Sequence, residues 1–389
     1  MPLENKVAVG KKKEEQMKTK ISASRTDDFV QCTLLYYYAV ELGLVPDVDS
    51  DVQRIGTNWH GMHDVVGNET DYNKVVEIIV EHLDEFYSHV PDTRTAEEWA
   101  IERNILLYSF IAYFLQFRDD PVEVLATEIK FEVPMRNPET GRALPNVVRR
   151  GKIDRILRYH NKLYIGEHKS TGKSVDAESS YFDNLRLAIQ PSLYYDVAIE
   201  LQTTGQLKQY GILADDPLLS GILYDVWHKP GIKPAKLTQA NTALFLEKHE
   251  YYNTQFDVVS AIFDTDCDPR CVVEGISVEL EPGKKSGTFA MKETPDMYGV
   301  RLLTDIQERP NFYFARREVP RTERDMIRFR HQLYSVYKNI LAMRRSGHWY
   351  GNPSHCEATY KCAYCPICYG QVDITQEKIP GFKFINKEK

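Results

Sequence analysis

The 389 residues carry 49 Lys and Arg against 56 Asp and Glu, so the formal net charge is -7 and any contact with nucleic acid has to come from a local basic surface. With 42% hydrophobic and 27% charged residues, the composition is typical of a soluble globular protein and excludes collagen-like, coiled-coil and disordered chains. No apolar run approaches the roughly 18 residues of a membrane span and none follows the lysine-rich N-terminus, so we expect an intracellular, cytoplasmic protein without a membrane partner.

The first part of the chain predicts a tail followed by helices. Residues 1–20 contain six lysines among polar neighbours and are expected to be a flexible basic tail. Ser22-Ala23-Ser24 is typical of a helix start, and apolar residues recur at helical spacing from about 54 to 117. We therefore expect an α-rich lobe at about 21–120.

The period changes after Pro121, where residues 127–134 alternate between apolar and polar. Further strands are predicted at 151–158, 162–168 and 221–227, and a helical pattern returns at 178–203. Strands mixed with helices indicate an α/β fold with one sheet, in a single domain at 21–380 whose sheet core spans about 121–263. Cysteines, prolines and glycines at 264–300 predict an irregular insertion, and about 310–370 a basic helix with a cysteine cluster.

A possible catalytic group lies on the predicted hairpin. Strand side chains alternate, so Glu167 and Lys169 share one face while His168 points to the other. If the two strands pair, Asp154 lies beside Glu167. Two carboxylates and a lysine supply hard oxygen ligands for Mg²⁺ or Mn²⁺ and a cation for the attacking water. This pattern alone is weak, because surface hairpins also alternate charges for solubility.

Asp154, Glu167 and Lys169 resemble the motif of the PD-(D/E)XK nucleases, although Ile153 stands where the name motif has proline. Three further segments look like motifs of the RecB-like exonuclease branch, which includes phage and CRISPR-adaptation nucleases. They are the helix 55–60 with its histidine, residues 190–194 as Q-x-x-x-Y, and residues 22–38 with a cysteine before three tyrosines. The resemblance implies a restriction-endonuclease-like core, a mixed sheet flanked by helices.

The resemblance also implies roles for individual residues. His60, Asp154 and Glu167 would hold Mg²⁺ or Mn²⁺, together with the backbone carbonyl of His168, and Lys169 would position the water. Gln190 would touch the site or the DNA backbone, and Tyr194 the DNA. Purely structural roles stay open for two of these residues. A histidine on an amphipathic helix, such as His60, is often simply buried, and a tyrosine such as Tyr194 can pack in the core. Glu128 is similar to an auxiliary acidic position of the family or is a solvated strand residue.

Seven cysteines in an intracellular chain argue for a metal site rather than disulfides. Cys356, Cys362, Cys365 and Cys368 fall within thirteen residues and could form a zinc knuckle by themselves. The resemblance instead implies a [4Fe-4S] cluster held by Cys32, Cys356, Cys362 and Cys368, with Cys365 as the alternative ligand. Cys267 and Cys271 are expected to be unliganded thiols.

Basic residues between 316 and 345 alternate with aromatic ones, a pattern that suits phosphates and unpaired bases. A helix with a solvated basic face is the competing interpretation. The candidate DNA contacts are Arg316, Arg317, Arg321 and Arg328.

Together these features predict a metal-dependent deoxyribonuclease, an exonuclease acting on single-stranded DNA ends. The resemblance implies a setting in phage DNA metabolism (in the host cytoplasm), recombination, repair or CRISPR adaptation. No helicase P-loop motif is present, so a helicase, recombination or single-strand-annealing partner is expected to supply unwinding. The alternatives are an inactive DNA-binding or assembly protein that keeps the fold and cluster, and a zinc-organised binding module.

Overall fold

A computed structural model describes residues 18–47, 51–176, 178–262, 269–358, 361–376 and 378–385. Most of the basic tail expected at 1–20 therefore lies outside the described residues, as does Cys267. Among the helices that are described, none is long and apolar enough to cross a membrane.

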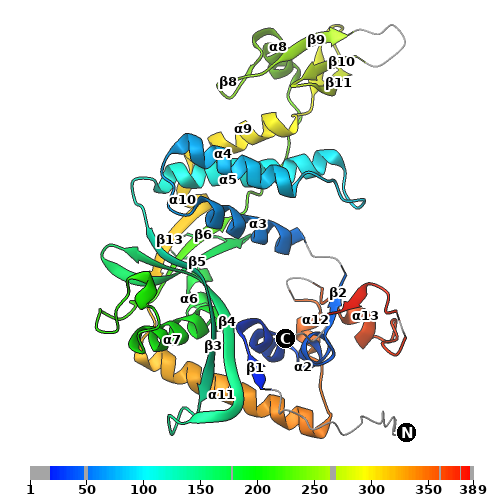
Figure 1. Cartoon of the computed structure of the whole chain (residues 1–389). Coiled ribbons are helices and arrows are strands. Elements are labelled where there is room, and N and C mark those ends of the chain that lie inside the picture. Colours follow the sequence, from blue (N-terminus) through cyan, green and yellow to red (C-terminus); the bar gives the residue numbers. More distant parts are fainter. Residues whose placement is uncertain are drawn as a thin grey trace.

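A twisted six-stranded sheet runs through the middle of the molecule (Figure 1). It has the order β1 (Thr19–Ile21), β4 (Ala143–Tyr159), β5 (Lys162–Thr171), β6 (Ile222–His228) and β13 (Phe314–Val319), and β3 (Glu123–Arg136) also pairs with β4. The β1–β4 and β5–β6 pairs are parallel and the others antiparallel, so the sheet is mixed. The predicted α/β fold with a mixed central sheet is confirmed.

The hairpin between β4 and β5 turns at the two residues that the sequence indicated. His160 and Asn161 have φ of 46° and 61°, the left-handed conformations that a two-residue hairpin turn requires. Asparagine tolerates this region better than most residues. The turn fixes the strand register, and with it the face of every side chain on β5.

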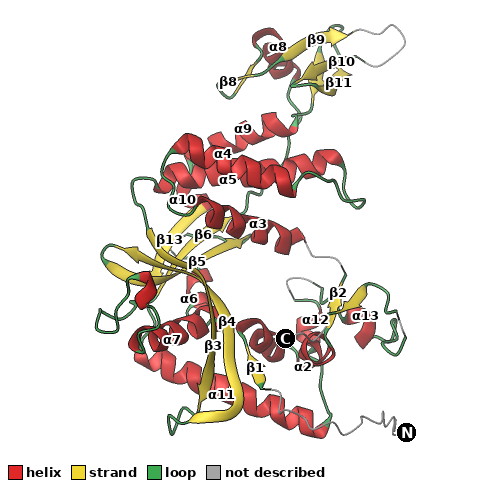
Figure 2. Cartoon of the chain, viewed as in Figure 1, coloured by secondary structure: helices red, strands yellow, loops and turns green. Residues whose placement is uncertain are grey.

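Helices cover both faces of the sheet (Figure 2). One face packs against α1 (Ala23–Gln31), α6 (Tyr181–Leu185), α7 (Ile189–Thr203) and α11 (Glu323–Ser346). On the other face lie α3 (Asp51–Val66), α5 (Ala96–Phe117) and α10 (Pro310–Tyr313), and α4 (Tyr72–Phe86) and α9 (Pro295–Glu308) pack on α5. Trp59 of α3 stacks on Trp227 of β6 with ring centroids 4.2 Å apart, which fixes the predicted helical lobe on the sheet.

The segment predicted as an irregular insertion is largely regular, so that prediction was wrong for its described part. A four-stranded antiparallel sheet has the order β12 (Phe289–Met291), β11 (Ile276–Pro282), β10 (Arg270–Val273) and β9 (Val258–Ile262). With α8 (Gln239–Lys248) it encloses a core that contains Cys271 and Leu280. Pro295 is the first residue of α9, where its missing N–H is harmless. Nearby lie the short β7 (Glu250–Tyr251) and β8 (Thr254–Gln255).

The two ends of the described chain lie together. β2 (Leu44–Pro46) pairs antiparallel with β14 (Phe382–Phe384). Short helices complete this region beside the sheet (Figure 1), namely α2 (Thr33–Tyr36), the π-helix η1 (Tyr37–Leu42), α12 (Pro353–Cys356) and α13 (Cys365–Cys368). Elsewhere a single 3-10 turn, η2 (Lys208–Tyr210), follows α7. The pairing brings the segment around Cys32 to the C-terminal cysteines.

Candidate active site

The predicted catalytic residues come together where β4 and β5 leave the hairpin. The β4–β5 pairing runs to Arg155 opposite Gly166, so the next step along the two strands holds Asp154 and Glu167. Lys169 follows on the same face of β5, and its Nζ lies 2.9 Å from Oε2 of Glu167. Alternation along the strands and the hairpin register thus produce the constellation.

Glu167 has the properties of a cation ligand. The residue is 1% exposed; the Lys169 ammonium contacts Oε2, and Oε1 has no hydrogen-bond donor among the described residues. A buried carboxylate without hydrogen bonds is costly unless a cation compensates its charge. Lys169 supplies one positive charge, and the free lone pairs of Glu167 fit a hard divalent ion.

Burial and neighbouring charges have opposite effects on the pKa values of Asp154 and Lys169. Burial raises the pKa of Asp154, while the positive charge of Lys169 opposes that shift. Burial also disfavours the charged form of Lys169, but the Glu167 carboxylate outweighs it and raises the lysine pKa. Lys169 is therefore a fixed cation rather than a proton donor near neutral pH.

His60 lies on α3 at the edge of the same group. Burial lowers its pKa, with Lys169 acting in the same direction, so the ring is a neutral imidazole that can ligate a metal. In the part of the chain that the structure describes, no three His, Cys, Asp or Glu side chains converge in metal-ligand geometry. His60, Asp154 and Glu167 are thus neighbours without forming a closed ligand set.

Gln190 and Tyr194 of α7 extend the group on the other side. Lys169 Nζ donates to Oε1 of Gln190 at 3.1 Å, and Nε2 of Gln190 donates to the Tyr194 hydroxyl at 3.4 Å. The two side chains lie one helical turn apart, so both face the strand. Gln190 therefore contacts the site itself, whereas Tyr194 is buried against Phe131.

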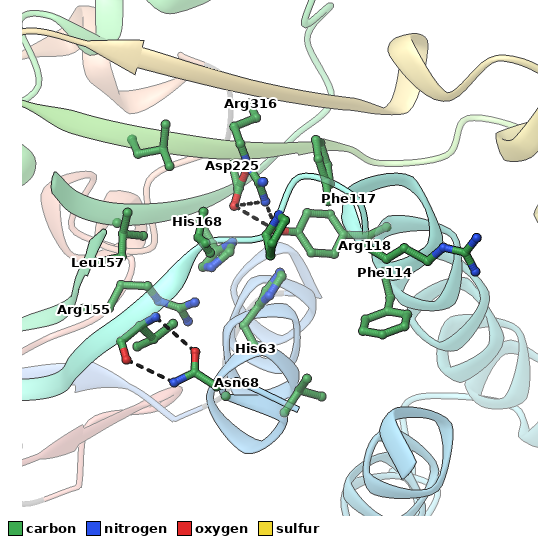
Figure 3. Close-up of a pocket in the computed structure, with 18 of the residues that line it drawn as sticks. His63, Asn68, Phe114, Phe117, Arg118, Arg155, Leu157, His168, Asp225 and Arg316 are labelled. Atoms are coloured by element: carbon green, nitrogen blue, oxygen red, sulfur yellow. Dashed lines mark hydrogen bonds and ion pairs between the residues drawn. The ribbon is translucent and has the colours of Figure 1, made fainter. Parts of the chain in front are cut away.

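His168 points to the opposite face of β5, as alternation predicts. Its ring stacks on His63 of α3 with centroids 3.5 Å apart. The pair borders a cavity of about 350 Å³, which also has Arg155 and Leu157 on the β4 side and aromatic residues of α5 on the other (Figure 3). Burial lowers the pKa of both histidines, so both are neutral. The stacked rings of His168 and His63 thus hold β5 against α3, the helix that also carries His60.

Two acidic residues near the site were missed from the sequence. Asp64 follows His60 by one helical turn, and its carboxylate lies 3.1 Å from Arg155. Burial raises the pKa of Asp27 on α1 to about 6, against the opposing charge of Lys169. The i, i+4 spacing could have indicated Asp64, but no local signal marks Asp27, which tertiary packing brings near. Glu128 forms an exposed ion pair with Lys152.

Cys32 lies beside the C-terminal cysteines despite the distance in sequence. Its Sγ accepts from the backbone N–H of Asn352 at 3.4 Å, while Sγ of Cys365 lies 3.7 Å from the Cys356 carbonyl oxygen. Burial raises the pKa of Cys362 to about 11, and nearby cysteines including Cys32 act in the same direction. All described cysteines are free thiols. Five of them gather in one region, and Cys271 lies apart in the small sheet.

Only some of the four arginines that were predicted to contact DNA lie on the protein surface. The segment that holds Arg316 and Arg317 is strand β13, and the helix begins later, at Glu323. Arg316 forms a buried ion pair with Asp225, and Arg321, 6% exposed, donates to the Leu185 carbonyl at 2.8 Å. Arg316 and Arg321 were predicted to contact DNA. Both face the interior, because acceptor groups of the protein already bind each guanidinium.

The other two arginines of that set have different positions. Arg317 lies over the Phe182 ring at 4.2 Å and is partly exposed. Arg328 is well exposed on α11 and forms a loose ion pair with Asp325 at 3.6 Å. Arg328 therefore remains available to an external anion, near the start of α11.

Comparison with known proteins agrees with this geometry. The sequence model of the PD-(D/E)XK nuclease superfamily matches residues 20–369, which include the β4–β5 hairpin and all five clustered cysteines. No curated protein matches the chain. The superfamily is one of metal-dependent nucleases, so the protein is a hydrolase that acts on nucleic acid. The chain belongs to the PD-(D/E)XK nuclease superfamily.

Proposed function

We propose that the protein is a Mg²⁺- or Mn²⁺-dependent deoxyribonuclease of the RecB-like branch, an exonuclease that acts on single-stranded DNA ends. The observation that carries the proposal is the buried Glu167 carboxylate next to Asp154, whose Oε2 is paired with Lys169 and whose Oε1 has no hydrogen-bond donor among the described residues. Stability alone does not explain this buried pair, since apolar residues in place of both Glu167 and Lys169 would often be equally or more stable. A role in recombination or repair stays a prediction.

Each residue has a proposed part in the reaction. His60, Asp154 and Glu167, with the backbone carbonyl of His168, would hold the divalent ion. The bound ion would acidify a water molecule and neutralise charge on the scissile phosphate. Lys169, held by Glu167 and Gln190, would orient that water and stabilise the charge that develops on the phosphate oxygens.

The test is digestion of end-labelled DNA by anaerobically purified protein with Mn²⁺, Mg²⁺ or EDTA. Linear single strands, linear duplexes and circular single strands separate an exonuclease from an endonuclease. We expect cleavage of linear single strands that needs the metal and is lost in Glu167→Ala and Lys169→Ala. The matched controls Glu247→Ala and Lys248→Ala change exposed residues of α8 and should cleave normally. Cleavage retained in both active-site variants would refute the assignment.

The second candidate is a catalytically inactive DNA-binding or assembly protein. It is favoured by one observation, that the described residues contain no converged group of three metal ligands. Tight DNA binding without cleavage at any metal concentration would support it. Intact Asp154, Glu167 and Lys169 favour the enzyme.

We also propose that Cys32, Cys356, Cys362 and Cys368 hold a [4Fe-4S] cluster, with Cys365 as the alternative ligand and structural Zn²⁺ as the alternative metal. The proposal is supported by the contact of Cys32 with Asn352, because a cluster there would tie the two ends of the domain together. Iron, sulfide and zinc analysis of anaerobically purified protein decides the metal.

Single variants decide which thiols act as ligands. Cys32→Ser and Cys368→Ser should lose iron, whereas Cys365→Ser should retain it. Iron lost from Cys365→Ser and retained in Cys368→Ser would exchange the roles of these two cysteines. Zinc without iron or sulfide in the unmutated protein would refute the iron-sulfur assignment.

A further inference from the structure

A groove of about 820 Å³ on the sheet is lined by basic side chains that are scattered in the sequence. It lies where β1, β4 and β3 run side by side (Figure 1). We call it the basic strand groove. Its lining residues are Lys18, Lys20, Lys130, Phe131, Glu132, Arg150, Gly151 and Lys152.

Strand pairing explains why the basic residues share one face. In the β3–β4 pair, Lys130 lies opposite Lys152 and Glu132 lies opposite Arg150. Lys20 of β1 pairs with Val148, two positions before Arg150. The intervening residues Phe131 and Ile153 are buried in the core against α1, α7 and α11. The basic side chains therefore project away from that core.

This arrangement is unfavourable for the protein alone. Like charges directly opposite each other across two strands destabilise a sheet, and Lys130 and Lys152 are such a pair. Glu128 neutralises Lys152, and Glu132 lies near Arg150, but the groove keeps an excess of positive charge in a chain whose net charge is -7. An anionic ligand with several charges would remove the repulsion.

The basic strand groove leads to the catalytic hairpin. Arg150, Lys152 and Asp154 succeed one another along β4, so the last lysine of the groove is two residues from the first catalytic carboxylate. The groove and the site therefore lie next to each other along β4.

We propose that the basic strand groove binds the sugar-phosphate backbone of the nucleic acid and leads it to Asp154 and Glu167. This inference rests on the proposed nuclease function and names the substrate path. The aromatic residue of the lining, Phe131, is 6% exposed and packs inward, so the groove binds phosphates and does not stack bases. Binding is then independent of base sequence and strongly dependent on salt.

The test measures binding alone, so that it does not depend on cleavage. Fluorescence anisotropy in EDTA gives the Kd for labelled single-stranded and duplex DNA between 50 and 300 mM salt. Lys20→Gln/Lys130→Gln is compared with Lys208→Gln/Lys248→Gln, which removes two exposed lysines outside the groove. Each lost phosphate contact makes the negative slope of log K against log salt shallower by about 0.7 for a single strand and about 0.9 for a duplex.

We expect the groove variant to bind more weakly and its slope to fall by about 1.4 on single strands or about 1.8 on duplexes, while the control variant keeps both values. A slope change on one substrate only identifies that substrate as the occupant. Unchanged slopes on both substrates would refute DNA binding in the basic strand groove, whatever the cleavage assay shows. Because Lys130→Gln also relieves the repulsion with Lys152, its melting temperature should not fall, so weak binding cannot be ascribed to unfolding.

Discussion

Replacing Arg316 with methionine removes one charge of a buried pair and leaves the other in place. The side chains of Arg316 and Asp225 are both 6% exposed. Nε donates to Oδ1 of Asp225 at 2.6 Å and Nη2 to Oδ2 at 3.1 Å, and the Tyr113 hydroxyl donates to the same carboxylate at 2.8 Å. Figure 3 shows the pair at the wall of the cavity behind the site.

The structure sets the size of the effect. Removing one partner of a buried ion pair costs about 3–5 kcal/mol, because the remaining charge is uncompensated. Tyr113 still donates to Asp225 in the Arg316→Met variant, so we expect a loss near the lower end, about 3 kcal/mol. Asp225→Leu should cost a similar amount. Since apolar replacement of both partners is often close to neutral, the double variant should recover at least half of the summed losses.

Urea unfolding of the four proteins in this double-mutant cycle measures the coupling. If the losses are additive, or if Arg316→Met loses less than about 1 kcal/mol, Arg316 and Asp225 do not form a coupled, buried ion pair. The same variant in the salt-dependent binding assay separates the two roles of Arg316. Retained stability with a slope reduced by about 0.7 would restore Arg316 as a DNA contact and refute its assignment to the interior.

Three further changes test the folded structure. Because burial raises the pKa of Asp27 from 3.8 to about 6, the folded state loses stability as the pH rises from about 4 to about 6 and carries the full penalty above pH 6. Asp27→Asn should therefore gain on the order of 1 kcal/mol at pH 8 and nothing below pH 4; equal gains in thermal melts at both pH values would contradict this cause. Gly299→Ala places a Cβ 2.1 Å from a ring carbon of Tyr108 and should cost about 1–3 kcal/mol in urea unfolding, whereas Gly231→Ala, with open space around it, should be neutral. Thr95→Ala removes the capping box of α5 and should cost about 1 kcal/mol, a loss that Thr95→Ser avoids if the cap is the reason.

Local chemistry along the chain was sufficient to predict the β4–β5 hairpin and which of its side chains share a face. Strand alternation places Glu167 and Lys169 on one face and His168 on the other, and His160-Asn161 is a turn that sets the register. The helical lobe and the helix start at Ser22 follow in the same way from periodicity and capping. Each of these signals acts over a few residues, so the sequence contains it in readable form.

Burial and pairing between distant segments could be decided only by the tertiary structure. A pattern of arginines does not reveal that Arg316 meets Asp225 in the interior, because the two positions are joined only by the pairing of β13 with β6. The strands β10 to β12 at 270–291 were missed because they are short and separated by turns that contain Gly275, Gly283 and Gly287, and packing against α8 stabilises them.

The same reason explains the basic strand groove. Lys20, Lys130 and Lys152 come from three strands, and no window of the sequence shows their common face. Cys32 likewise reaches Asn352 only through the folding of both ends onto one another. The sequence by itself determined which residues can do the chemistry, since that depends on side-chain type and local spacing. The tertiary structure decided which charges stay in solvent and where they gather, since that depends on contacts between segments far apart in the chain.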